Sequence, residues 1–394
     1  MDGFDIHNIE RQFDQFQDKL KNSLEISNVN RKDILDFQRN CFAEGIGTGR
    51  ILKYSLQLFT ISKWLPVSFK EATKEHIIDL VQEIERKRYS EWTKHDYKVG
   101  LKKFYKWLRD TEEGYPIEVR WMKTGIKNSK KKLPEELLDV EDVKKLIESA
   151  QHPRDKAFVS MLYESGARIG EILTLRIKHV EFDDYGVKLM VSGKTGMRRV
   201  RIIGSVSYLS NWLNYHPYRE DPESPLWLSI GSKCYNKKIK YRAMAVRLMK
   251  IAKRAGVKKR VNPHSFRHAR ASHLAQHLSP YQLNQLFGWT QGSDMAATYV
   301  HLSGKDVDDA LLVLAGKKKR QDSSTNLETK ECPRCKYSEN GIDAMFCGQC
   351  GCALSFKAVD KAKDVENKVG VLIEALMSGK ITKEDLAEMV KNVG

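Results

Sequence analysis

Residues 263–301 read PHSFRHARASHLAQHLSPYQLNQLFGWTQGSDMAATYVH, and the rest of the chain is best interpreted outward from them. Apolar residues recur at spacings of three and four, which predicts helices over 264–277, 279–287 and 294–300. His264 and Arg267 then share one helix face at i and i+3. Gly288-Trp289 follows the second helix, and Tyr299 lies in the third.

Upstream of this stretch, helical and strand patterns are mixed. Helical spacing predicts further helices over 140–149, 155–164, 205–215 and 243–255, and another from near Ile169. Val187, Leu189 and Val191 alternate with polar residues, as do Val200 and Ile202, and Gly193-Lys194-Thr195-Gly196 is the turn between these two strands. With a last helix over 305–314, residues 134–316 are predicted to form a mostly α domain with a small antiparallel sheet.

The first 115 residues carry only the helical pattern. They predict a small, basic, all-helical domain, in which residues 1–24 are an additional N-terminal helix; Leu52, Leu56, Phe59 and Ile61 are expected to face inward. Residues 116–133 change character and form a basic linker. Two interpretations stay open for its cations: a solvated linker, or a strap along DNA phosphates. These cations include Arg120, Lys123, Lys130, Lys131 and Lys132.

Charge and composition restrict the function. The 394 residues include 68 Lys plus Arg and 51 Asp plus Glu, so the net charge is 68 − 51 = +17. No apolar run approaches the roughly 18 residues that a membrane span needs, and the acidic, amphipathic start is unlike a signal peptide. We therefore expect a cytoplasmic, nucleoid-associated protein whose partner is a polyanion, double-stranded DNA above all, and no membrane.

The order of polar residues in the 134–316 domain points to phosphoryl transfer without a metal. Charge on a phosphodiester in transit needs donors that keep their protons, and two guanidiniums supply them. A tyrosine hydroxyl can take over the phosphate as an ester, and a Lys on a mobile hairpin can protonate the departing 5′-oxygen. The chain offers one residue for each role: Arg168, Lys194, His264, Arg267, Trp289 and Tyr299.

With these motifs, residues 25–315 resemble the tyrosine recombinases, the phage integrase family that includes the Xer-like enzymes. The resemblance implies that Arg168 and Arg267 clamp the scissile phosphate and that Tyr299 is the nucleophile. Lys194 would be the general acid and His264 the acid/base partner; Trp289 would be the donor where many relatives have a second His. Glu171 matches an acidic position that supports the first Arg, and His268 a buried structural position outside the chemistry.

The resemblance further implies a site-specific recombinase with a 3′-phosphotyrosine intermediate. It implies a homo-tetramer on two duplexes, no nucleotide cofactor and no metal in catalysis. The loop from Trp289 to Tyr299 is one residue longer than usual, so Tyr299 can act in cis or from a neighbouring subunit. Arg198 and Arg199, on the Lys194 hairpin, are alternative cations. Two other functions stay open: a type IB topoisomerase-like DNA-relaxing enzyme and a non-catalytic DNA-binding adaptor.

A cysteine cluster lies beyond the predicted tether of residues 317–330. Cys332 and Cys335 form one Cys-x-x-Cys pair, and eleven residues later Cys347 and Cys350 form another. Two such pairs place four thiolates around one structural Zn²⁺, so residues 331–353 are predicted to form a zinc ribbon. Cys352 is interpreted as non-ligating. The tail over 360–394 is expected to form two helices.

Overall fold

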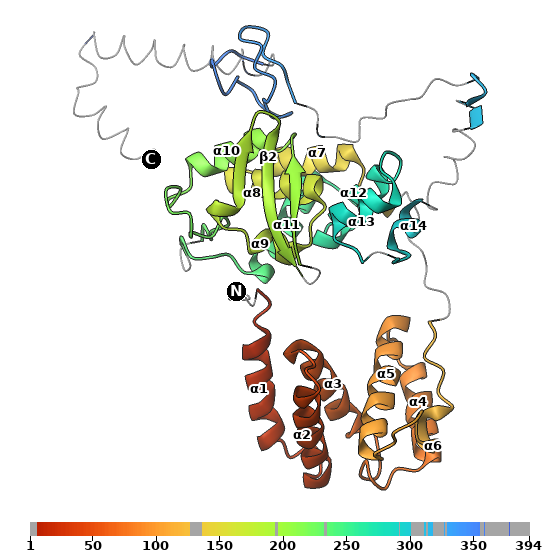
Figure 1. Cartoon of the computed structure of the whole chain (residues 1–394). Coiled ribbons are helices and arrows are strands. Elements are labelled where there is room, and N and C mark those ends of the chain that lie inside the picture. The colour runs from red at the N-terminus through yellow and green to blue at the C-terminus, as the bar shows by residue number, and fades with distance from the viewer. Residues whose placement is uncertain are drawn as a thin grey trace. The chain divides into compact units, whose positions relative to one another are not determined.

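The computed structural model describes residues 6–126, 136–193, 196–231, 235–290, 292–300, 311–312, 314–317, 327, 329–354, 358 and 378 (Figure 1). The chain divides into two compact units, Met1–Lys131 and Lys132–Gly394. The division falls inside the stretch that the sequence predicts as a basic linker. Lys130, Lys131, Lys132, Lys194 and the helices predicted over 360–394 lie outside the described residues, as does most of the predicted tether.

The first unit is helical throughout its described part. Ser27, Thr73 and Ser90 each cap a helix, because each side chain accepts a hydrogen bond from a backbone N–H in the first turn. Phe16 and Leu20 are buried with the later helices in a single core, so the N-terminal helix belongs to this domain. The helices are α1 (Ile9–Asn22), α2 (Asn28–Ala43), α3 (Thr48–Ile61), α4 (Lys74–Arg86), α5 (Glu91–Leu108) and α6 (Ile117–Arg120).

Two details of this unit differ from the sequence-based expectation. Leu56 is 46% exposed, whereas Leu58 is buried, because the inward face of α3 passes through Leu52, Ser55 and Leu58. The stretch predicted as a linker begins with α6. Val119 and Met122 are buried in the first core, so the linker character starts only after Met122.

The second unit is mostly helical around a three-stranded antiparallel sheet of order β1-β2-β3, which confirms the predicted fold class. Val187 pairs with Ile202 and Gly193 with Gly196, so β2 and β3 form the predicted hairpin. Strand β1 was not predicted. The described elements are α7 (Val140–Ser149), α8 (Pro153–Ser165), α9 (Ile169–Leu173), the 3₁₀ turn Ile177–His179, β1 (Val180–Asp183), β2 (Gly186–Gly193), β3 (Gly196–Ile202), α10 (Val206–Asn214), α11 (Tyr241–Ala255), α12 (Pro263–Leu274), α13 (Pro280–Phe287) and α14 (Met295–Val300).

Helix α8 lies at the centre of this unit and is buried along almost its whole length. It packs against α7, α10, α12 and β3 (Figure 1). Its last turn is fixed by Glu164, whose carboxylate accepts hydrogen bonds from the backbone N–H groups of Ile203, Gly204 and Ser205. These three hydrogen bonds therefore hold the end of α8 in place directly before Gly166. Among the described residues, no helix has the length and apolar character to cross a membrane.

Candidate active site

Arg168 is aimed by the sharp turn that ends α8. Gly166 has φ 56°, a left-handed conformation that favours glycine. A Cβ on Gly166 would also lie 2.4 Å from the Phe287 ring, so only glycine fits here. Arg168 is the N-cap residue of α9, and its side chain stays about a third exposed (32%). The turn thus brings a partly accessible guanidinium to the surface of the domain.

Glu171, one turn into α9, has a buried carboxylate held by two arginines. Its Oε1 accepts from Arg168 Nη1 at 3.0 Å and from Arg198 Nη1 at 2.9 Å. Its Oε2 accepts from the Arg168 backbone N–H at 2.8 Å and from Arg198 Nη2 at 2.7 Å. Burial opposes ionisation, yet the hydrogen bonds from Arg198 and Arg168 lower the pKa of Glu171. The carboxylate is therefore charged at neutral pH.

Arg267 reaches the same place from α12. It is buried, and it donates to the Gly166 carbonyl at 2.9 Å and to the Phe287 carbonyl at 2.6 Å. Burial and the neighbouring Arg168 charge lower the pKa of Arg267 to about 10. Arg267 therefore still carries its charge at neutral pH, in a setting with little water.

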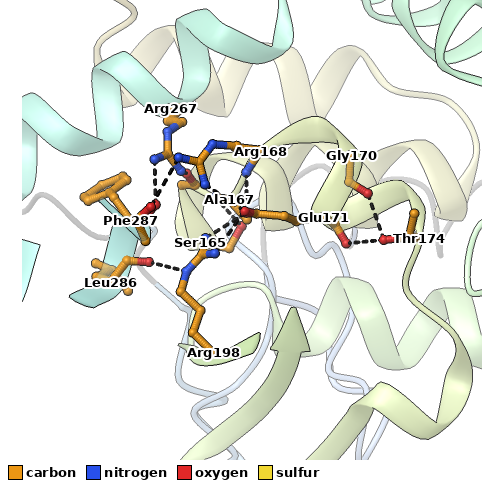
Figure 2. A network of polar contacts seen from close by, with 12 residues as sticks. Ser165, Ala167, Arg168, Gly170, Glu171, Thr174, Arg198, Arg267, Leu286 and Phe287 are labelled. Carbon is orange, nitrogen blue, oxygen red and sulfur yellow. Dashed lines mark hydrogen bonds and ion pairs between the residues drawn. The ribbon is translucent and has the colours of Figure 1, made fainter. Parts of the chain in front are cut away.

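Three successive backbone carbonyls at the end of α13 each accept a hydrogen bond from one of these three arginines. Leu286 accepts from Arg198 Nε at 2.8 Å, Phe287 from Arg267 Nη2, and Gly288 from Arg168 Nη2 at 3.2 Å. The last carbonyls of a helix have no partner within the helix and carry its negative end charge. Figure 2 shows the guanidinium groups gathered around Glu171 and this helix end. The arrangement fixes a compact positive centre.

His264 lies in the first turn of α12, on the same helix face as Arg267. Pro263 is the first residue of α12, and the Asn262 side chain caps it by accepting from the Ser265 N–H. The His264 side chain is exposed, unlike that of Arg267. The start of α12 thus presents an accessible imidazole beside a buried guanidinium.

A stack of aromatic rings connects Tyr299 to the arginine cluster. The Trp289 ring is parallel to the Tyr299 ring, with centroids 5.4 Å apart, and stacks on Phe287 at 4.8 Å. The Arg267 guanidinium carbon lies 5.5 Å from the Trp289 ring centroid and 5.1 Å from that of Phe287. Tyr299 is therefore held by its own chain, one ring away from Arg267.

The Tyr299 hydroxyl is in hydrogen-bond contact with His268 Nδ1. Burial raises the pKa of this hydroxyl against the opposing effect of the Arg267 charge. His268 was expected to be a buried structural residue, but it is only partly buried. It lies one helical turn beyond His264, which puts both imidazoles and Arg267 on one side of α12.

The hairpin that carries Lys194 meets the cluster at its base. Lys194 itself lies outside the described residues. A Cβ on Gly193 would lie 2.4 Å from Glu171 Oε1, so this end of β2 abuts the buried carboxylate. The structure brings together Arg168, Arg267, Trp289 and Tyr299 from the start of α9, α12, the end of α13 and α14, and His264 lies on the Arg267 face of α12.

The sequence offered Arg198 only as an alternative cation to Lys194 and did not predict its pairing with Glu171. A signal was available, because period-two alternation along β3 puts Arg198 on the same sheet face as the buried Val200 and Ile202. Arg199 faces the other way and is exposed.

Comparison with known proteins identifies the domain that holds this site. Residues 136–305 match the model of the phage integrase family. Over residues 136–305, which we call the integrase domain after this match, the chain is similar to the phage integrase family.

The integrase domain has several similar proteins. A tyrosine recombinase of Pseudothermotoga lettingae is 28% identical over 254 residues, which cover 62% of this chain and 83% of that protein. Transposase A from transposon Tn554 of Staphylococcus aureus is 27% identical over 48% of this chain and 55% of its own length. The tyrosine recombinase XerC of Xanthomonas campestris pv. campestris is 30% identical over 44% and 52%, respectively. This chain thus matches about half the length of the last two relatives.

Solved structures are similar in fold over most of this chain. The XerH site-specific recombinase in a post-cleavage complex with its difH substrate has a TM-score of 0.55 and 17% identity, covering 78% of this chain and 95% of that one. A lambda integrase dimer bound to a core site has a TM-score of 0.56 and 13% identity, covering 70% and 77%.

Beyond the integrase domain, the four predicted cysteine ligands come together. The sulfur atoms of Cys332, Cys335, Cys347 and Cys350 all lie within 4.8 Å of one another. Cys332 and Cys350 are 3.6 Å apart, as are Cys335 and Cys347. Cys352 is not in this group, and its thiol instead lies 3.6 Å from the Ala353 carbonyl. The cluster is positioned to bind a metal ion.

The ribbon of residues 329–354 is seated on the integrase domain. Lys156 of α8 forms an ion pair with Asp343, and a Cβ on Gly341 would lie 2.7 Å from the Tyr208 ring of α10. Leu327, just before the ribbon, is buried with its carbonyl against Gly204. Sequence reasoning did not foresee this docking, because its contacts join residues more than a hundred positions apart.

Proposed function

We propose that this protein is a site-specific DNA recombinase that cuts and rejoins strands through a 3′-phosphotyrosine. The observation that carries the proposal is the meeting of Arg168 and Arg267 at the end of α13, with Tyr299 stacked beside them through Trp289. Two fixed cations and a tyrosine hydroxyl are what metal-free transfer of a phosphodiester needs.

In the proposed reaction, the scissile phosphate binds between the two guanidiniums. The Tyr299 oxygen bonds to phosphorus and the bond from phosphorus to the 5′-oxygen breaks, so the DNA is held through a 3′-phosphotyrosine. Arg168 and Arg267 stabilise the charge on the non-bridging oxygens. The phenol proton leaves to a base, for which His264 is the proposed partner, and Lys194 gives a proton to the 5′-oxygen.

The remaining residues of the site have supporting roles in this proposal. The Trp289 indole N–H is a further donor to the phosphate. Rejoining reverses the sequence: a 5′-hydroxyl attacks phosphorus and Tyr299 leaves. Because one ester replaces another, the step needs no nucleotide cofactor. Tyr299 is proposed to act in cis, since its own chain holds it beside Arg267.

DNA contact is proposed for cations in both units. Arg120, the last residue of α6, and Lys123, directly after the last core residue Met122, are exposed, in keeping with a phosphate-binding strap. Lys130, Lys131 and Lys132 are proposed to continue it. A homo-tetramer on two duplexes is the proposed assembly, and the lambda integrase solved as a tetramer on a Holliday junction is a precedent in a fold relative. Such a protein would act in the cytoplasm, at the nucleoid.

Zinc is the proposed metal of the cysteine cluster. Four sulfurs about 2.3 Å from a tetrahedral Zn²⁺ lie about 3.8 Å from each other, close to the 3.6 Å of two sulfur pairs here. With all four positions taken by Cys332, Cys335, Cys347 and Cys350, bound zinc would stabilise the ribbon fold.

A covalent-trapping experiment tests the proposal. The chain is incubated with a pool of nicked duplexes of randomised sequence. Cleavage of such a duplex releases the short fragment that carries the 5′-hydroxyl, so that rejoining is prevented. We expect one sequence class to be captured covalently at the 3′ side of the break. Capture of every sequence alike, with relaxation of any supercoiled plasmid, would favour a type IB topoisomerase. Binding without capture would leave a DNA-binding adaptor.

A further inference from the structure

Two adjacent arginines on β3 occupy opposite environments. The Arg198 side chain is 11% exposed and faces the buried side of the sheet. Arg199 is exposed on the other face. They have the same charge and length, so any difference between them comes from what Arg198 touches.

Arg198 ties together two of the elements that form the site. Its two terminal nitrogens contact both oxygens of Glu171 in α9, at 2.9 and 2.7 Å, and its Nε donates to the Leu286 carbonyl at 2.8 Å. Figure 2 shows the side chain reaching from the strand to both partners. All three contacts are charge-assisted hydrogen bonds, and the pairing with Glu171 is bidentate.

This pairing decides how many hydrogen bonds the Glu171 carboxylate can still accept from the Arg168 side chain. Because Arg198 takes one lone pair on each carboxylate oxygen, the Arg168 side chain makes a single contact with Glu171, through Nη1. The other terminal nitrogen of Arg168 is held on the Gly288 carbonyl. Without Arg198, the carboxylate would be free to form a bidentate pair with Arg168 and draw its guanidinium inward.

The charge balance leads to the same conclusion. Arg168, Arg198 and Glu171 sum to +1, and Arg267 brings the site to +2, opposite one phosphodiester of charge −1. Without Arg198, Glu171 would neutralise Arg168, and the site would fall to +1. Because Glu171 and Arg267 are buried, that difference is screened less than it would be between exposed charges.

We propose that Arg198 is a positioning residue for strand cleavage: by pairing with Glu171, it leaves the charge of the Arg168 guanidinium available to the scissile phosphate and keeps that group oriented toward it. The inference rests on the proposed function and assigns to Arg198 no contact with DNA. It distinguishes Arg198 from Lys194, whose proposed role is at the leaving oxygen.

The test compares Arg198→Ala with Arg199→Ala on the nicked duplex that the wild-type chain traps best. Each variant loses one cation from the same strand. We expect Arg198→Ala to form the covalent complex about 30- to 100-fold more slowly in single turnover, as for a misplaced catalytic group. Arg199→Ala should stay within about twofold, with any loss confined to DNA affinity. Equal rates for the two variants would overturn the proposal.

A second substrate separates the two catalytic roles. In a duplex with sulfur in place of the bridging 5′-oxygen, the departing thiolate needs no general acid. Arg198→Ala should remain slow on this duplex, because its defect lies in the phosphate clamp. Recovery to the wild-type rate would mean that Arg198 acts through the leaving group, and would overturn the assignment.

Two further variants cover loss of folding. Arg198→Lys keeps the charge but not the bidentate pair, so it should fold and recover part of the rate. Adding Glu171→Gln to Arg198→Ala removes the uncompensated carboxylate and should raise the rate about threefold or more over Arg198→Ala alone. If neither improves on Arg198→Ala, Arg198 does not act by offsetting the Glu171 charge. If the wild-type chain traps no duplex, the proposed function itself fails.

Discussion

Tyr299 combines two properties that matter for a nucleophile. Its ring is fixed by the parallel Trp289 ring, so attack would need little reorganisation of the side chain. Its hydroxyl contacts His268, and burial raises its pKa, so the phenol is protonated at neutral pH. A proton acceptor is therefore required at the moment of attack.

His273, six residues after Arg267 on α12, should make stability depend on pH. Burial, with the nearby Arg270 charge, lowers the pKa of His273 to about 4, and Tyr163 contacts its Nδ1 at 2.8 Å. The unfolded chain takes up this proton near pH 6.5 but the folded chain only near pH 4. The stabilisation is therefore complete above about pH 6.5 and is lost as the pH falls toward 4.

We expect the free energy of unfolding to fall by about 2 kcal/mol from this group between pH 7 and pH 5. Urea titrations at both pH values measure it, with His273→Gln as the non-titrating variant. His277→Gln, at an exposed position on the same segment, is the control. Equal losses of stability on acidification in His273→Gln and the wild-type chain would contradict this role of His273.

Some residue roles could be predicted from the sequence and others could not. Arg168, Arg267 and Tyr299 stand in a motif whose order is rare by chance, and the fold brings them together. Arg198 and His268 owe their positions to contacts between elements. The sequence suggests that Arg198 faces inward, but it does not show that Arg198 contacts Glu171 there. Nothing in the sequence around His268 sets it apart from other residues of the helix; what distinguishes it is its contact with the Tyr299 hydroxyl.

At the scale of elements, Glu164 joins α8 to the start of α10. Its buried carboxylate accepts from three successive backbone N–H groups, at 2.7 Å from Ile203, 2.9 Å from Gly204 and 2.8 Å from Ser205. This join fixes the helix whose end aims Arg168. The period of the sequence predicted both elements, but not the carboxylate between them.

Glu164→Gln should therefore lower the free energy of unfolding by about 2 to 4 kcal/mol, because the neutral amide weakens three charge-assisted bonds. Glu148→Gln, on the exposed side of α7, should change it by less than about 0.5 kcal/mol. Chemical denaturation of both variants gives the comparison. Equal stabilities would show that the Glu164 charge contributes nothing to the join.

The ribbon should depend on its metal without supplying catalysis. Cys347→Ser removes one of four clustered thiols, so the chain should bind less metal and residues 329–354 should become open to protease. Cys352→Ser, outside the cluster, should keep both properties. Metal analysis and limited proteolysis make the measurement. Covalent DNA trapping should survive Cys347→Ser, and its abolition would place a catalytic role in the ribbon.

At the scale of the whole molecule, the net charge of +17 predicts binding dominated by phosphates. Composition gives this property without any structure. The seating of the ribbon could not be predicted, because nothing in the Cys-x-x-Cys pairs specifies a partner surface. The tail beyond residue 358 stays a sequence-based prediction.

DNA affinity should fall steeply with salt. For about six to ten phosphate contacts, the association constant drops about 10³- to 10⁵-fold between roughly 50 and 200 mM salt. Arg120→Ala and Lys123→Ala should each reduce the slope of log affinity against log salt by about one. Fluorescence anisotropy across a salt series measures this. A flat series would contradict phosphate-dominated binding.

The most direct measurement for the central proposal is mass spectrometry of the peptide that stays attached to a trapped nicked duplex. After protease and nuclease digestion, we predict a nucleotide remnant on Tyr299, in the sequence MAATYVH (residues 295–301), and no adduct from Tyr299→Phe. An adduct on another residue, or undiminished trapping by Tyr299→Phe, would contradict the proposal that Tyr299 takes over the DNA strand.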